Sequence, residues 1–164
     1  MKPKPRAISD TSFLSVMNDI SYLNLCSAVF ERVYISKSVY DEVEQSGIRS
    51  LTVCLEELIW SGFIIVKKCS NIALVNSFKS FLGSGEAETI TLALELEEAD
   101  VVILDELKAR NLYEKLGITK RLIGTIGVLK FMLTHGIIKE SVDAVITKLE
   151  QAGFRFKRDL FKNC

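Results

Sequence analysis

The chain has 164 residues, enough for one domain with a sizeable core, and 48% of them are hydrophobic, which excludes a disordered chain. Lysine and arginine (21) balance aspartate and glutamate (21), so a broadly basic nucleic-acid-binding surface is excluded, although a local patch is not. With one histidine, and with cysteines that show no CxxC spacing, the chain offers little material for histidine-based catalysis or a zinc site.

The sequence also bears on the compartment in which the protein works. The first ten residues lack the apolar stretch of a signal peptide, and no segment has the length of a transmembrane helix. Scattered cysteines are typical of reduced thiols in a cytosolic protein. We therefore expect a cytoplasmic protein in which the four cysteines are free: Cys26, Cys54, Cys69 and Cys164.

In chain order, short apolar strand-like segments alternate with segments of helical periodicity. Strands are expected at 7–9, 32–36, 63–68, 101–104 and 120–123, and helices at 12–29, 38–60, 72–81, 86–98, 106–116, 125–134 and 139–151. This alternation predicts an α/β fold in which helices cover both faces of a parallel sheet. In such folds, ligands bind beyond the carboxyl ends of the strands, where the strand order reverses.

Two of the expected strands end in an aspartate. Asp10 follows the strand at 7–9, and Asp105 follows the strand at 101–104. Since right-handed crossovers leave parallel strands pointing the same way, both carboxylates should emerge at one edge of the sheet. Each also has a structural alternative, because Asp10 can cap the next helix and Asp105 can interact with the dipole of the helix that Glu106 opens.

A third acid lies in the stretch GSGEAETITLALELEE. On a helical wheel, Glu86 falls near the middle of the apolar arc, whereas Glu88, Thr91 and Glu95 fall on the opposite side. A carboxylate on a buried helix face needs a partner or a cation, and the alternative for Glu86 is satisfaction by the free N–H groups of the first turn. We therefore expect Glu86 in a site and Glu88 in solvent.

A fourth acid lies in the stretch YISKSVYDEVEQSG. Val39 and Val43 mark the buried face of the expected helix, Glu42 borders that face, and Asp41 points away from it. Taken alone, Glu42 is an ordinary surface acid. Its functional interpretation depends on the three other carboxylates.

Four carboxylates that share one pocket cannot all stay ionised unless a cation neutralises them. Oxygen ligands without histidine or thiolate favour Mg²⁺ or Mn²⁺. Such an ion activates water and screens phosphate charge, so the natural substrate of the predicted site is a phosphodiester.

Five stretches carry a resemblance to a known family: ISDTSFL, VYISKSVYDEV, GSGEAETITLALEL, VVILDELKARNLYEKLG and LIGTIGVLKFMLTHGII. In this order, from about residue 7 to 138, they resemble the PIN-domain nucleases, most closely the PIN-like branch that contains many prokaryotic proteins and toxin-like members. The resemblance implies one three-layer PIN-like domain over residues 1–164, with a core at about 7–138 and a C-terminal helix and tail at 139–164. It also implies a central parallel sheet of four or five strands.

The resemblance assigns roles to the acids. Asp10, Glu42, Glu86 and Asp105 match the family's acidic positions, which form a catalytic pocket that binds Mg²⁺ or Mn²⁺ and hydrolyses RNA as an endoribonuclease. The implied metal ligands are Asp10, Glu86 and Asp105. Glu106 stands where relatives usually carry a second aspartate, and its longer side chain would alter the metal geometry if it is a ligand. 

Other residues are candidates for substrate binding. Thr11 or Ser12 could hydrogen-bond a ligand or a bound water, and Lys120 and Arg121 border the expected strand at 120–123 near the same edge. The basic residues at 108, 110 and 115 are interpreted as the solvated face of their helix, with contact to a phosphate backbone as the alternative. The aromatic residues of the tail GFRFKRDLFKNC are expected to pack against the body of the protein.

Three functions remain open at this point. The first is a metal-dependent ribonuclease; one form of it is the toxin of a toxin–antitoxin pair, in which a small antitoxin protein covers the acidic pocket. The second is a catalytically degenerate PIN-like module that binds RNA or a protein partner. The third is a phosphoryl-transfer domain of the haloacid-dehalogenase or receiver type, disfavoured because Ser12 stands where the dehalogenase type needs a second aspartate. The sequence allows a homodimer without requiring one.

Overall fold

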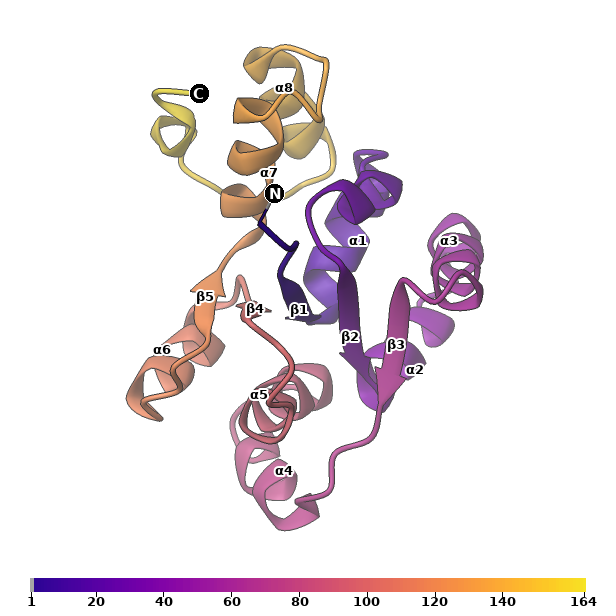
Figure 1. Ribbon diagram of the computed structural model, residues 1–164, viewed down its shortest axis with the longest axis vertical. Helices are drawn as coiled ribbons and strands as arrows, with labels where there is room; N and C mark the ends of the chain where they lie inside the picture. The colour runs from indigo at the N-terminus through magenta and orange to yellow at the C-terminus, as the bar shows by residue number, and fades with distance from the viewer. Residues whose placement is uncertain (1) are drawn as a thin grey trace.

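A parallel five-stranded sheet forms the centre of the computed structural model, which describes residues 2–164 (Figure 1). The strands are β1 (Arg6–Ser9), β2 (Arg32–Ser36), β3 (Ile64–Lys67), β4 (Val101–Ile103) and β5 (Arg121–Ile123), in the spatial order β3-β2-β1-β4-β5. All neighbouring strands pair in parallel. The predicted α/β fold with a parallel sheet is therefore confirmed, and the number of strands is five.

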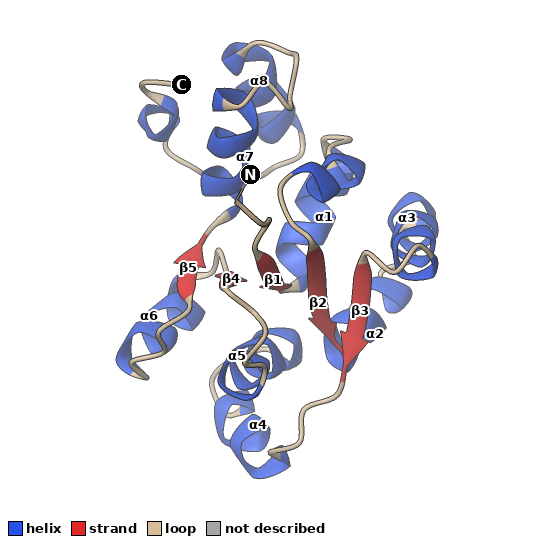
Figure 2. Cartoon of the chain, viewed as in Figure 1, coloured by secondary structure: helices blue, strands red, loops and turns tan. Residues whose placement is uncertain are grey.

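Helices cover both faces of this sheet, so the fold has three layers (Figure 2). One face carries α4, α5 and α6, and the other carries α1, α2, α3, α7 and α8. Alternate residues of each strand point to opposite faces, as in β1, where Ala7 joins one core and Ile8 the other. The helices are α1 (Thr11–Asp19), α2 (Lys37–Gln45), α3 (Arg49–Trp60), α4 (Ile72–Lys79), α5 (Ser84–Glu95), α6 (Leu107–Lys115), α7 (Thr125–Thr134) and α8 (Val142–Gln151), with short 3₁₀ helices at Leu23–Ala28 and Arg158–Phe161.

Two expected helices are shorter than the sequence pattern suggested. The segment 38–60 forms α2 and α3, because Gly47 between them adopts a positive φ of 72° that a helix cannot continue through. The segment 12–29 forms α1 and a 3₁₀ helix, separated at Ser21, whose φ is 67°. In both places the apolar periodicity continues past the residue at which the helix ends. The periodicity therefore did not predict the break in the helix.

The order of the strands reverses between β1 and β4. From β1 the chain builds β2 and β3 on one side, then passes to the other side for β4 and β5. The register aligns Ser9 with Ile103, the last residues of the two strands. The residues that follow β1 and β4 therefore leave the sheet side by side, at the position where α/β proteins bind ligands.

Two further expectations concern the whole chain. All four cysteines are free. Within residues 2–164, no helix has the length and apolar character needed to cross a membrane.

Candidate functional site

Asp10 follows β1 at this reversal point and is buried, with 2% of its surface exposed. Its Oδ1 accepts a hydrogen bond of 3.1 Å from the backbone N–H of Phe13, so it caps α1. The pKa of Asp10 is raised to about 7, mainly by burial and in addition by the charges of Asp105, Glu86 and Glu42, against the lowering effect of the Phe13 hydrogen bond. Asp10 therefore caps α1 and also lies at the predicted site, so the two interpretations do not exclude each other.

Asp105 follows β4 and is held by Thr125, the first residue of α7. Its two oxygens accept hydrogen bonds from the backbone N–H of Thr125 at 2.8 Å and from the hydroxyl of Thr125 at 2.5 Å. Thr125 is completely buried. A side chain at the preceding residue, Gly124, would place its Cβ 2.9 Å from Asp105 Oδ1, so glycine leaves room for the carboxylate. No role for Thr125 is predicted from the sequence, although it lies in the stretch LIGTIGVLKFMLTHGII that carries part of the family resemblance.

Glu42 bridges three helices. The hydroxyl of Thr11 on α1 donates to Glu42 Oε2, and the backbone N–H of Gly85 on α5 donates to Glu42 Oε1 at 2.9 Å. A Cβ at Gly85 would lie 2.7 and 2.9 Å from the two carboxylate oxygens, so the close approach of α5 to Glu42 depends on glycine. The Thr11 hydroxyl therefore orients Glu42 in this structure.

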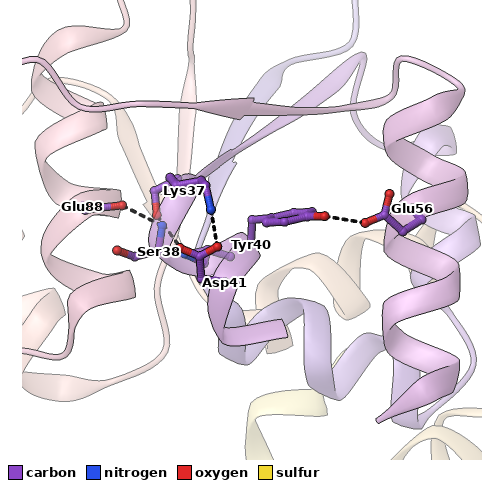
Figure 3. Close-up of polar contacts among 8 residues, drawn as sticks. Lys37, Ser38, Tyr40, Asp41, Glu56 and Glu88 are labelled. Carbon is purple, nitrogen blue, oxygen red and sulfur yellow. Dashed lines mark hydrogen bonds and ion pairs between the residues drawn. The ribbon is translucent and has the colours of Figure 1, made fainter. Parts of the chain in front are cut away.

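The helix that carries Glu42 is fixed on both sides (Figure 3). From α5, Glu88 accepts a 2.8 Å hydrogen bond from the backbone N–H of Ser38 in the first turn of α2. On the other side, the Tyr40 hydroxyl donates to Glu56 of α3 at 2.6 Å. The prediction that Glu88 faces solvent is wrong, because the helical wheel could not show that α2 packs against that side of α5.

Glu86 lies in the first turn of α5 and is half-buried. Burial raises the pKa of Glu86, and the charges of Glu106 and Glu42 raise it further, while a hydrogen bond with the Gly83 backbone lowers it. Glu106 itself caps α6, since its Oε2 accepts a 3.0 Å hydrogen bond from the N–H of Ala109. Glu106, the residue that departs from the family pattern, therefore has a structural role at the edge of the site.

Asp10 and Asp105, which follow β1 and β4, thus share one edge of the sheet with Glu42 of α2 and Glu86 of α5, and the charges of the other three acids raise the pKa of Asp10. Their oxygen-only donor set suits Mg²⁺ or Mn²⁺, and the buried Asp10 carboxylate requires a compensating charge when ionised. Within residues 2–164, however, no three acidic, histidine or cysteine side chains are placed as ligands of one ion. Glu42 and Asp105 accept one hydrogen bond with each carboxylate oxygen, which orients both groups and leaves a second lone pair on each oxygen.

The basic residues are distributed differently from the prediction. Arg121 is the first residue of β5, so Lys120 and Arg121 lie at the amino edge of the sheet, opposite the carboxylates. Their predicted place near the acids is wrong, because the strand begins beside them instead of ending there. Arg110, interpreted from the sequence as part of a solvated helix face, lies at the site and donates from Nη1 to the carbonyl of Leu104 at 2.5 Å.

Comparison with known proteins bears on this arrangement. A protein-family model described as a PIN domain matches residues 6–164, nearly the whole chain. A search of curated proteins finds no match to the chain.

Proposed function

Since the chain belongs to the PIN-domain nuclease superfamily, we propose that it is a divalent-metal-dependent endoribonuclease. PIN domains generally use divalent metals, and PIN nucleases generally act on RNA or DNA. The specific proposal is hydrolysis of RNA phosphodiesters with Mg²⁺ or Mn²⁺, by residues 1–164 acting as one domain.

The observation that carries the proposal is the convergence of four carboxylates on the reversal point of the sheet. Asp10, Glu86 and Asp105 would hold the metal ion, which supplies an activated water and screens the phosphate charge. Glu42, fixed by Thr11 and Gly85, completes the acidic pocket and contributes to the field that raises the pKa of Asp10. Thr125 orients Asp105 through two hydrogen bonds.

The test is cleavage of a mixed single-stranded RNA pool by the purified protein with Mn²⁺, with Mg²⁺ and with EDTA. Wild type is compared with Asp10→Asn, which keeps an amide oxygen for the cap of α1, and with Asp19→Asn, the same substitution at an exposed position of that helix. We expect metal-dependent cleavage by wild type and Asp19→Asn and none by Asp10→Asn. Cleavage in EDTA, or by folded Asp10→Asn at the wild-type rate, would contradict the proposal.

A narrower form of the proposal is a cytoplasmic toxin whose acidic pocket a small antitoxin covers. The free cysteines are compatible with that compartment. Induced expression in bacterial cells tests it: a toxin should arrest growth as wild type and not as Asp10→Asn.

The second candidate function is a PIN-like module that binds RNA or a protein without cutting. It is favoured by one observation, that residues 2–164 contain no preformed three-ligand metal site. In the cleavage assay this candidate predicts intact RNA with every ion.

A further inference from the structure

A cavity of about 630 Å³ opens directly beside Asp105. Its walls come from the start of α1, from α6 and α7, and from the C-terminal tail, with Ser12, Arg110, Lys130 and Arg155 among the lining residues. We call it the tail cavity, because residues 154–156 and Leu160 close one side of it. Ser12, a predicted substrate contact, therefore faces this cavity and not the Glu42 side of the pocket.

Three cations line the tail cavity next to the acidic pocket: Arg110, Lys130 and Arg155. Among residues 2–164, none of them forms an ion pair, although Asp105 and Glu106 line the same cavity. By contrast, the neighbouring Arg158 pairs with Glu150. The three cations are thus available to an anionic ligand that approaches Asp105.

The tail also supplies an aromatic wall beside these charges, with Arg155 between its two phenylalanines. Phe154 and Phe156 are half-buried and stack with ring centroids 6.2 Å apart, and Phe156 meets the buried Phe161 edge-to-face at 5.7 Å. Because Phe161 is anchored in the core beside α7, this wall is held in a fixed orientation. A ligand that satisfies the cavity combines negative charge with an apolar, planar group.

We propose that the tail cavity is the subsite for the nucleotide next to the scissile phosphate of a single-stranded RNA. Arg110, Lys130 and Arg155 contact its phosphates, and its base lies against Phe154 and Phe156. The volume falls within the range of about 300–1,000 Å³ for small-ligand pockets. Stacking on Phe154 and Phe156 requires an exposed base face, so the subsite favours unpaired RNA over a duplex. This inference rests on the proposed nuclease function.

The test measures RNA binding separately from cleavage, by fluorescence anisotropy of a labelled single-stranded RNA in EDTA. Arg155→Ala and Lys130→Ala should each raise Kd about 5-fold or more and reduce the salt dependence of log Kd by about one counterion. Lys157→Ala removes the same charge two residues further along the tail, outside the cavity, and should bind as wild type. Equal weakening in all three variants, or none in the first two, would overturn the subsite.

The aromatic wall is tested with Phe154→Leu, which keeps an apolar side chain for packing. It should weaken single-stranded RNA binding several-fold while the thermal unfolding midpoint changes little, and a duplex of the same sequence should bind wild type about 10-fold more weakly than the single strand. Duplex binding as tight as single-strand binding would overturn the selection for unpaired RNA.

Failure of the subsite and failure of the nuclease proposal are distinguishable. If Arg155→Ala and Lys130→Ala cleave RNA with unchanged KM, the nuclease proposal stands and the subsite proposal fails. Binding that depends on both cations, without cleavage under any ion, retains the subsite and favours the binding module.

Discussion

At the scale of single residues, Asp10 combines two conditions that oppose each other. It is buried among three other carboxylates, which disfavours its charge, and it caps α1, which favours a charge only weakly. The native protein therefore holds a proton on Asp10 up to about pH 7, whereas the unfolded chain loses it near the ordinary pKa of 3.8. Between these values unfolding releases a proton, so stability falls as pH rises.

This linkage predicts that Asp10→Asn stabilises the protein at pH 8 in EDTA. Relative to the variant, wild type should lose about 2–3 kcal/mol of unfolding free energy between pH 5 and pH 8, since asparagine keeps the cap but carries no charge. Urea denaturation of both proteins across this pH range provides the measurement. Parallel stability curves would show that Asp10 does not carry the raised pKa.

A substitution at Gly85 should change the geometry of the site with little effect on the stability of the protein. In Gly85→Ala, the new Cβ meets the end of the Glu42 side chain, which can swing away at little cost, and alanine favours the helix by up to about 1 kcal/mol. We expect nearly unchanged stability but cleavage reduced by about 10-fold or more, because Glu42 loses its orientation.

The matched control is Gly83→Ala, where a Cβ meets nothing within 4 Å. It should leave cleavage near wild type and lower stability by about 0.5 kcal/mol, since Gly83 is the N-cap of α5 and alanine is less favourable there. If Gly85→Ala cleaves RNA as fast as this control, the position of Glu42 has no part in the reaction.

The residues that could be predicted from sequence are those with a local signal. Asp10 and Asp105 stand directly at strand ends, and Glu86 lies in the first turn of the helix that starts within the GSG stretch. Thr125 could not be predicted, because it meets Asp105 only through the return of α7 to the sheet edge. Arg110 was misplaced although its partner Leu104 is close in sequence, because helical periodicity does not show how the start of α6 lies against the end of β4.

At the scale of elements, α5 shows why periodicity alone misplaces side chains. The helical wheel assumed one buried face, but α5 lies between the sheet and neighbouring helices, and Thr91 on the expected solvent side is completely buried. Glu95, on the same side of the wheel, reaches the start of α4, where it accepts hydrogen bonds from the N–H groups of Ser70 and Asn71 at 2.8–3.0 Å. A buried helix thus uses its acids to cap other helices.

Removing this cap should be measurable. Glu95→Ala leaves the N–H groups of Ser70 and Asn71 without their acceptor, and we expect a loss of about 1 kcal/mol in unfolding free energy. Glu97→Ala, at an exposed position two residues later, should change stability by less than about 0.5 kcal/mol. Faster amide exchange at Ser70 and Asn71 in the first variant only would locate the effect, whereas equal losses in both variants would contradict it.

At the scale of the whole molecule, the alternation of strands and helices predicted the fold. Each pair of parallel strands needs a crossover connection, usually a helix, and these helices can pack only on the two faces of the sheet. The sequence of an individual segment could not predict that the strand order reverses between β1 and β4. The position of the reversal depends on the edge of the sheet that β4 joins. That choice is what brings together acids separated by almost one hundred residues.

Because β1, α2, α5 and β4 each contribute one carboxylate, an ion bound among them should stabilise the whole fold. At pH 8, Mn²⁺ at 100 times its Kd would add about 2.7 kcal/mol, which raises the Tm of a chain of this size by about 5–10 °C. Asp105→Asn keeps its hydrogen-bond acceptor for Thr125 but loses a charged ligand, so the increase should largely disappear, while Glu97→Gln retains it. Thermal unfolding with MnCl₂, compared with KCl of equal ionic strength, separates binding from screening. A wild-type Tm that MnCl₂ leaves unchanged would contradict a metal site in this pocket and favour the binding module.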